Sequence, residues 1–204
     1  MYMFNNIKKI AIIGNSGFAK EISYSFQKNM FDFFVNKEYL TKGDYKTKAI
    51  EDLDFDKYKI LLGIGDPILR KKIVDNFPKN AEYMTYIDKN AIILDKETVK
   101  IGKGTVICAG AILTTNINIG DFGQINLNST IGHDCNLGKF LTMSPGVHIS
   151  GNTNIGDLNY YGTNTALKNN IDIVDNVIVG MNSNVIKNIN ESGVYVGNPL
   201  KKIR

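Results

Sequence analysis

The sequence predicts a small α/β domain followed by an all-β domain that is wound as a parallel β-helix. Two observations carry this prediction. Up to about residue 86, short apolar runs that end in glycine alternate with helical stripes. After residue 95 the long helical stripes vanish, and an apolar residue recurs at every sixth position. We place the α/β domain at 1–86, the β-helix at 87–190 and a C-terminal tail at 191–204.

The α/β domain opens with Ile10-Ala11-Ile12-Ile13, a short β-branched run that is typical of a buried parallel strand. The residues from Gly14 to Gly17 break this strand. Apolar residues at Ile22, Phe26 and Met30 then indicate a helix. The first element pair is therefore a strand, a glycine turn and a helix.

The same order recurs later in the domain. The segment 60–65 predicts a second buried strand that ends in glycine, and an apolar stripe from Leu69 to Phe77 predicts a helix that stops before Pro78. Two successive strand–turn–helix units indicate a Rossmann-like α/β domain.

The β-helix prediction depends on an uninterrupted period of six. Fifteen consecutive steps from Ile101 meet an apolar residue: Ile101, Ile107, Leu113, Ile119, Ile125, Ile131, Leu137, Met143, Ile149, Ile155, Tyr161, Leu167, Ile173, Val179 and Val185. We expect each hexapeptide to form one short strand and one turn, with the apolar side chain pointing inward. Three hexapeptides would close a triangular coil, so residue i would stack on residue i+18, and fifteen hexapeptides would give five coils.

Composition excludes several classes of protein. A hydrophobic fraction of 43% and a charged fraction of 22% are those of an ordinary globular domain. No apolar run approaches the roughly 18 residues of a membrane span, and Met1 to Lys9 lacks a secretory signal, so a cytoplasmic location is expected. The net charge of +4 suits anionic ligands and equally a lysine-rich surface. Because basic residues form no stripe interleaved with aromatics, no nucleic-acid partner is expected.

The cysteines and the other possible metal ligands do not indicate a redox or metal site. Cys108 and Cys135 lack the spacing of a zinc or redox motif and fall at different phases of the repeat, so both are expected to be free and buried. No cluster of metal ligands is visible, and no metal site is expected.

The chain has two histidines, and they fall at different phases of the repeat. His133 follows the inward Ile131 by two residues, which places it at a coil corner or on the outer face rather than in the core. Since the ordinary pKa of imidazole lies near neutrality, His133 is suited to act as a general base. His148 is offset by about 10 Å from the point above His133. It could line a groove, but a solvated turn residue is the favoured interpretation.

Three stretches resemble the hexapeptide-repeat acyltransferases, in particular the subgroup with an N-terminal Rossmann-like domain. That subgroup contains bacterial sugar-nucleotide N-acetyltransferases, such as the one acetylating a UDP-4-amino-4,6-dideoxy sugar on the way to bacillosamine, and sialic acid O-acetyltransferases. The stretches are residues 12–17, residues 131–138 with Pro145-Gly146 and 150–152, and residues 196–200. The resemblance implies a left-handed β-helix and a homotrimer whose active site lies between neighbouring β-helices.

The resemblance also implies roles for residues of the β-helix. His133 is expected to be the catalytic base, with Asp134 raising its basicity. Acetyl-CoA, as co-substrate, is expected along the groove in contact with Thr142, Thr163 and Gly180. Thr142 stands where the bacillosamine enzyme has a histidine.

In the α/β domain the resemblance implies a nucleotide-sugar site. The glycine turn is followed by a helix N-terminus, whose N–H groups suit a phosphate or a carbonyl. Contacts are expected through Ser16, Gly17 and Gly65, with Phe18 and Asn36 lining the same site. Phe18 stands where many relatives have histidine. Asn36 and its neighbour Lys37 stand where many have two aspartates that contact the nucleotide.

The expected activity is transfer of an acetyl group from acetyl-CoA to the amine of a nucleotide-linked 4-amino-4,6-dideoxy sugar in the synthesis of bacterial surface glycans. O-acetylation of sialic acid or a similar sugar is the alternative, and the departures at Phe18 and Asn36 favour it somewhat. A non-catalytic, ligand-binding β-helix is the third possibility, against which the Gly132-His133-Asp134 motif speaks.

Overall fold

The structure, a computed structural model, describes residues 8–41, 44 and 46–204. Residues 1–7, which make up most of the segment considered for a secretory signal, lie outside the described residues. The chain divides into two compact units, one formed by Met1–Ile64 and Ile73–Met84 and the other by Gly65–Lys72 and Thr85–Arg204. Within the described part of the chain, no helix is long and apolar enough to cross a membrane.

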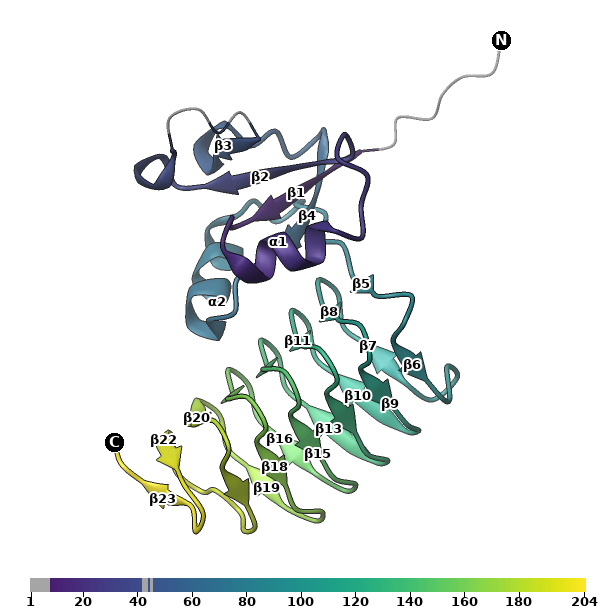
Figure 1. Ribbon diagram of the computed structural model, residues 1–204, viewed down its shortest axis with the longest axis vertical. Coiled ribbons are helices and arrows are strands. Elements are labelled where there is room, and N and C mark those ends of the chain that lie inside the picture. Colours follow the sequence, from purple (N-terminus) through teal and green to yellow (C-terminus); the bar gives the residue numbers. More distant parts are fainter. Residues whose placement is uncertain (1–7, 42–43, 45) are drawn as a thin grey trace. The chain divides into compact units, whose positions relative to one another are not determined.

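The first unit is built on a four-stranded parallel sheet in the order β3-β2-β1-β4 (Figure 1). Its strands are β1 (Lys9–Ile13), β2 (Phe31–Val35), β3 (Thr47–Ala49) and β4 (Tyr58–Leu62). Short 3₁₀ helices follow β2 and β3, at Lys37–Tyr39 and Ile50–Asp52. The two buried strands expected from the sequence are confirmed as β1 and β4, although β4 ends three residues earlier than expected.

The helices of the chain are short. Helix α1 covers Gly17–Ser23 and α2 covers Pro67–Asn76. The prediction that the first helix continues through Phe26 and Met30 is wrong. Helix α1 ends at Ser23, and the chain turns at Gln27–Met30 before it enters β2. A β-carbon at Gly63, just after β4, would lie 2.7 Å from that of Ala19 in α1, so this glycine allows the helix to pack closely on the sheet.

The second unit contains three sheets of short strands. The five-stranded sheet holds β7 (Lys100–Ile101), β10 (Ile117–Ile119), β13 (Cys135–Leu137), β16 (Asn154–Ile155) and β19 (Asp172–Ile173). The six-stranded sheet holds β6 (Ile92–Ile93), β9 (Ile112–Leu113), β12 (Thr130–Ile131), β15 (His148–Ile149), β18 (Ala166–Leu167) and β21 (Asn184–Val185). The eight-stranded sheet holds β5 (Tyr86–Ile87), β8 (Val106–Ile107), β11 (Gln124–Ile125), β14 (Thr142–Met143), β17 (Tyr160–Tyr161), β20 (Val177–Val179), β22 (Gly193–Val196) and β23 (Lys201–Lys202).

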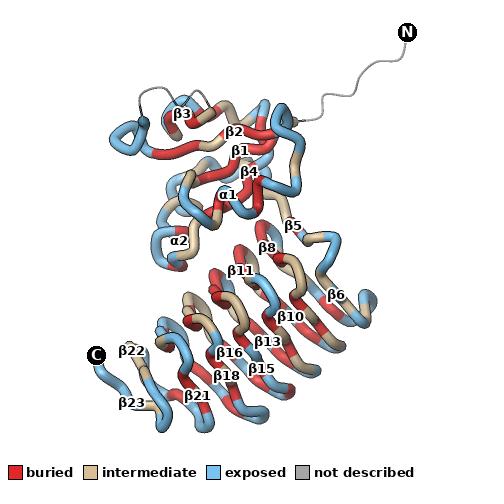
Figure 2. The backbone as a smooth tube through the Cα atoms, viewed as in Figure 1, coloured by how far each residue is buried: buried red, intermediate tan, exposed pale blue. Residues whose placement is uncertain are grey.

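The chain visits these sheets in turn, so the unit is a parallel β-helix (Figure 1). Ile119 pairs with Leu137, and Leu137 pairs with Ile155, which confirms the predicted offset of 18 residues. Of the fifteen residues of the hexapeptide series, all are buried except Ile101, which is half-buried against the same core (Figure 2). The inward column is therefore confirmed as the core of the unit.

The corners of the β-helix have a regular backbone. Residues with a left-handed φ recur every six positions from Gly104 to Asn182, and most of them are Asn, Asp or Gly, the residues that adopt this conformation most easily. The regular spacing changes at both ends of the stack. Near the C-terminal end, Val179 pairs with Tyr195, 16 residues further on, so the last coil is two residues shorter than the coils before it. At the N-terminal end, Ile93 pairs with Leu113, 20 residues further on, so the first coil contains two residues more than the regular coils. The extra residues lie between β6 and β7.

The remaining expectations concern the cysteines and the tail. Cys108 and Cys135 are both buried and are not joined in a disulfide, as predicted. The tail contains β22, which stacks in parallel on β20, and β23, which turns back antiparallel to β22. Tyr195 and Leu200 pack against the core of the β-helix. The last residues thus cover the open end of the stack.

Candidate active site

His133 and Asp134 lie at the corner between β12 and β13, where the chain passes from the six-stranded to the five-stranded sheet. The Nδ1 atom of His133 lies 2.7 Å from Oδ2 of Asp134, and the two side chains are 57% and 45% exposed. A carboxylate that accepts from Nδ1–H leaves the lone pair of Nε2 free. The pair therefore presents a basic nitrogen to an incoming molecule.

Asp134 has a second partner, which the sequence did not indicate. Asn116, at the same corner one coil below, donates a hydrogen bond of 2.5 Å from its side-chain amide to Oδ1 of Asp134. This bond, together with the one from His133, holds the pKa of the Asp134 carboxyl below its ordinary value. Asp134 is therefore negatively charged at neutral pH.

The imidazole of His133 lies against Gly151, at the equivalent position one coil above. A β-carbon at Gly151 would come within 2.6 Å of Nε2, 2.7 Å of Cε1 and 3.0 Å of Cδ2 of the ring. The imidazole of His133 can occupy this position because Gly151 has no side chain. The 18-residue period identified Gly151 as the neighbour of His133, but only the coordinates show that a side chain there would displace the ring.

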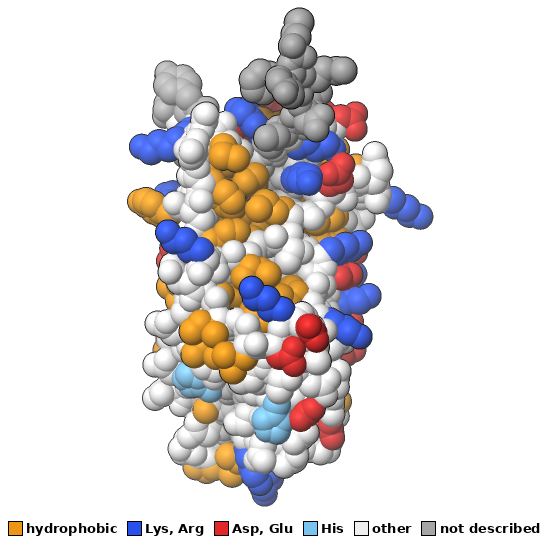
Figure 3. Space-filling view, turned by 90° about the vertical axis from the view of Figure 1, so that its right-hand side faces the viewer, with side chains coloured by type: hydrophobic (Ala, Val, Ile, Leu, Met, Phe, Trp, Pro, Cys, Tyr) orange, Lys and Arg blue, Asp and Glu red, His pale blue; other side chains and the backbone are white. Residues whose placement is uncertain are grey.

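His148 is exposed, as expected, but it lies in strand β15 and not in a turn. Strands of two residues are too short for the sequence pattern to separate them from turns. Its Nδ1 lies 2.9 Å from the hydroxyl of Thr130, the residue below it in the six-stranded sheet. Both histidine side chains are visible on one face of the molecule (Figure 3).

Thr142 is buried, and its hydroxyl is engaged within the unit. The hydroxyl donates to the carbonyl of Gly65 at 2.8 Å and accepts from the guanidinium of Arg70 at 3.0 Å. A direct contact between Thr142 and acetyl-CoA is therefore not supported. Arg70, a residue that sequence reasoning missed, also donates to the carbonyls of Phe122 (2.9 Å) and Phe140 (2.8 Å).

Arg70 is fully buried, and the negative charge of Asp66 partly opposes the effect of burial on its pKa. Burial lowers its pKa to about 9, which leaves the guanidinium charged at neutral pH. Its carbonyl acceptors lie at the corner between the five-stranded and eight-stranded sheets. Arg70 thus fastens the segment Gly65–Lys72 to that corner of the β-helix.

Thr163 and Gly180 lie at the remaining corner, between the eight-stranded and six-stranded sheets. Thr163 is half-buried, and its carbonyl accepts from the N–H of Asn182. The N–H of Gly180 donates to the carbonyl of Tyr195. The two residues lie at the same corner on successive coils, one position out of register. The six-stranded sheet separates this corner from the corner of His133.

The residues expected to contact a nucleotide sugar divide between the units. Ser16 and Gly17 follow β1, and Asn36 follows β2, so all three are exposed at the carboxyl edge of the first unit's sheet. Phe18 is half-buried in the first turn of α1. Gly65 follows β4 in sequence but belongs to the second unit.

Gly65 lines an open pocket of about 470 Å³ in the second unit. Asp66 and Ile68 form one wall together with Gly65, and Leu158 and Tyr160 contribute to the other. The Oδ1 atom of Asp66 accepts the backbone N–H of Ile68 at 2.8 Å, which fixes this carboxylate at the start of α2. The lining is mainly apolar, with a carboxylate and a phenol at its rim.

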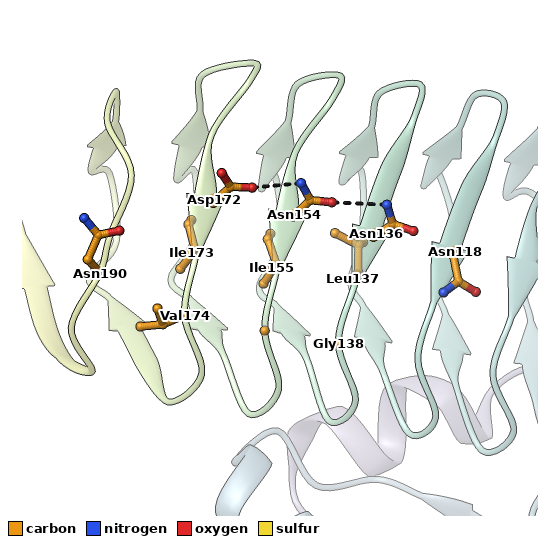
Figure 4. A pocket seen from close by; sticks show the side chains of 11 residues that line it. Asn118, Asn136, Leu137, Gly138, Asn154, Ile155, Asp172, Ile173, Val174 and Asn190 are labelled. Carbon is orange, nitrogen blue, oxygen red and sulfur yellow. Dashed lines mark hydrogen bonds between the residues drawn. The ribbon is translucent and has the colours of Figure 1, made fainter.

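The outer face of the five-stranded sheet, next to the His133 corner, carries a ladder of amides (Figure 4). The side chain of Asn136 donates to Asn154 at 3.1 Å, and Asn154 donates to Asp172 at 2.8 Å. The ladder links successive coils on this face. Across residues 8–41, 44 and 46–204, no group of three or more His, Cys, Asp or Glu side chains is placed to hold a metal ion.

No protein-family model matches the chain. Several solved structures match it over nearly its whole length. WeeI from Acinetobacter baumannii AYE is 29% identical, with a TM-score of 0.86 over 96% of this chain and 100% of that one. The acetyltransferase domain of PglB from Neisseria gonorrhoeae FA1090 is 23% identical, with a TM-score of 0.83 over 96% of this chain and 100% of that one.

PerB from Caulobacter crescentus, solved with CoA and GDP-perosamine, is 22% identical, with a TM-score of 0.85 over 97% of this chain and 98% of that one. Variants of that protein are described as a perosamine N-acetyltransferase. The chain thus shares its fold with sugar N-acetyltransferases of the hexapeptide-repeat family, which confirms the resemblance drawn from its sequence.

Proposed function

We propose that the chain is an acetyl-CoA-dependent N-acetyltransferase that acts on the amine of a nucleotide-linked 4-amino-4,6-dideoxy sugar in the synthesis of bacterial surface glycans. The observation that carries the proposal is the exposed, hydrogen-bonded pair of His133 and Asp134 at a coil corner. Structures of similar fold support the choice of ligands, since PerB was solved with CoA and GDP-perosamine and the PglB domain with acetyl coenzyme A.

The geometry suits general-base catalysis of acetyl transfer. Nε2 of His133 takes a proton from the sugar amine as the amine nitrogen attacks the thioester carbonyl. The C–N bond forms, the C–S bond breaks, and the thiolate of CoA leaves and is protonated. Asp134 stabilises the imidazolium that forms meanwhile. No nucleophilic side chain is needed, because the acceptor supplies its own amine.

We assign the nucleotide part of the acceptor to the first unit. The strand order β3-β2-β1-β4 is the one found in Rossmann-like domains, where ligands bind at the carboxyl ends of the strands. Ser16, Gly17 and Asn36 share that edge, which supports them as contacts. We likewise assign a left-handed sense to the β-helix, on its similarity to the solved acetyltransferases.

A homotrimer explains why the candidate residues of one copy do not meet. His133 and the pair Thr163 and Gly180 occupy different corners of the β-helix, on either side of the six-stranded sheet. A groove between two copies places the His133 corner of one against the Thr163 corner of the next. Acetyl-CoA then lies between copies, with Thr163 and Gly180 as its contacts.

The test follows release of the CoA thiol from acetyl-CoA with a panel of UDP-, dTDP- and GDP-linked 4-amino sugars and with sialic acid. His133→Ala is expected to lower turnover at least a hundredfold. His148→Ala is the matched control and is expected to keep wild-type turnover, because the ring of His148 is hydrogen-bonded to Thr130 within its own sheet. Wild-type turnover in His133→Ala would remove the proposed function.

O-acetylation of sialic acid or a related sugar is the second candidate. It is favoured by Phe18 and Asn36, which stand where many relatives carry the histidine and aspartate that line the nucleotide site. Turnover with sialic acid alone would select this activity. Absence of turnover with every acceptor, combined with binding of acetyl-CoA, would instead favour a non-catalytic β-helix.

A further inference from the structure

A column of polar side chains supports His133 from the coils below it. The two carboxylate oxygens of Asp134 have different partners. Oδ2 contacts Nδ1 of His133, and Oδ1 accepts a hydrogen bond from the side-chain amide of Asn116. Asn116 and Asp134 are 18 residues apart, and both have a left-handed backbone, with φ of 51° and 57°. The equal backbone conformation points the two side chains along the same corner, one above the other.

Asn116 is itself anchored from below. Its backbone N–H donates to the hydroxyl of Thr98 at 2.8 Å, and that hydroxyl donates to Oδ2 of Asp95 at 2.7 Å. The hydroxyl of Thr115 donates to the same carboxylate oxygen at 2.8 Å. Asp95 and Thr98 belong to the loop between β6 and β7, where the first coil contains its two extra residues. The irregular loop therefore provides the base of the column.

We propose that Asn116 is a positioning residue of the acetyl-transfer site, whose amide holds Asp134 so that the carboxylate keeps His133 in the Nδ1–H form with Nε2 free. The proposal rests on the proposed role of His133 as the base. Asn116 acts through Asp134 and needs no contact with substrate. An amide is suited to this place because it donates to Asp134 without adding a charge.

Charged groups near the column are few. Asp95 and Lys100 lie on the coil below Asn116, and Lys168 lies at the same corner two coils above His133. Asp134 is the charged group in hydrogen-bond contact with the imidazole. The form of the ring is therefore controlled mainly by where the carboxylate of Asp134 points.

Nitrogen NMR of the histidine rings tests the proposal directly, because the chain has two histidines and His148 serves as an internal reference. Ring ¹⁵N shifts at about pH 8.5, where an ordinary imidazole is neutral, distinguish the Nδ1–H from the Nε2–H form. We expect the Nδ1–H form at His133 in the wild-type protein. Asn116→Gly keeps the left-handed backbone and removes the donor, so the ring is expected to move toward the Nε2–H form.

Asn170→Gly is the matched control. Asn170 lies at the same corner, has a φ of 57° and is exposed, and its replacement is expected to leave the His133 shifts unchanged. Asn116→Asp is the second variant and decides the matter if Asn116→Gly does not fold. Its carboxylate cannot donate to Asp134, so the ring of His133 is again expected to move toward the Nε2–H form.

The outcomes separate this inference from the proposed function. An Nδ1–H form that survives in both Asn116 variants would overturn the positioning role, even if His133→Ala abolishes turnover. A shifted ring form in the Asn116 variants would support the positioning role, with turnover expected to fall about tenfold alongside it. Full turnover in His133→Ala would refute the base itself, whatever the NMR spectra show.

Discussion

Gly151→Ala should lower the catalytic rate strongly without destabilising the fold. The new β-carbon would lie 2.6 Å from Nε2 and 2.7 Å from Cε1 of His133, whereas ordinary van der Waals contact begins near 3.4 Å. The ring must therefore retreat by about 1 Å. A displacement of that size at a reacting group can lower a rate about a hundredfold, so we expect kcat to fall by roughly 10- to 100-fold.

Stability should respond much less, because the atoms in the way are the end of a side chain that can rotate. Thr115, two coils below Gly151, and Asn169, one coil above it, occupy the equivalent positions, so the backbone at this corner tolerates a β-carbon. We expect the melting temperature to stay within about 2 °C. The assay combines CoA-thiol release with thermal unfolding.

Two further variants complete this test. Asn169→Ala shortens a side chain one coil above Gly151 and serves as the control, with activity unchanged. Adding Gly151→Ala to His133→Ala should cost no further activity, since both changes act on one imidazole. Wild-type kcat in Gly151→Ala, or a further loss in the double variant, would refute the reasoning.

Two predictions concern stability. Tyr161→Phe should raise the free energy of unfolding by about 1 kcal/mol, because the buried Tyr161 hydroxyl has no hydrogen-bond partner within the described structure. A loss of stability in urea titrations would contradict this. Arg70→Met should lower the free energy of unfolding by about 3 kcal/mol or more, because it removes the hydrogen-bond donor of the buried carbonyls of Phe122 and Phe140. Arg70→Lys should fall between wild type and Arg70→Met, since one ammonium cannot reach both carbonyls; equal stability of all three proteins would exclude the fastening role.

The fold could be predicted well from the sequence where a single period governs it. The inward residues from Ile107 to Val185 are all buried, so the six-residue pattern determines the register of the coils between them. The first domain was harder to predict. Its helix α1 stops at Ser23, because the return of the chain to β2 overrides an apolar stripe that extends to Met30.

The candidate site could be predicted only in part. The phase of the repeat places His133 outside the core, and the motif supplies Asp134 as its partner. Asn116 escaped notice, because it carries no reactive group and contacts the pair across coils. The period placed Gly151 next to His133, but it did not show how closely the ring approaches this glycine.

Thr142 was expected to contact acetyl-CoA from the family resemblance, but it is buried. The six-residue period describes the β-helix alone. It contains no information about the segment Gly65–Lys72, which covers Thr142.

Two departures from the regular corner residues and spacing mark places where the β-helix is specialised. Left-handed corners favour Asn, Asp and Gly, yet Phe122, Phe140 and Leu158 adopt this conformation at one corner, at a cost of about 1–2 kcal/mol each. The rings of Phe122 and Phe140 stack at 5.0 Å, and their carbonyls accept from Arg70, so burial and hydrogen bonds offset the strain. The other departure is the longer first coil below His133. The repeat thus changes where it holds the covering segment and where its first coil supports the His133 corner.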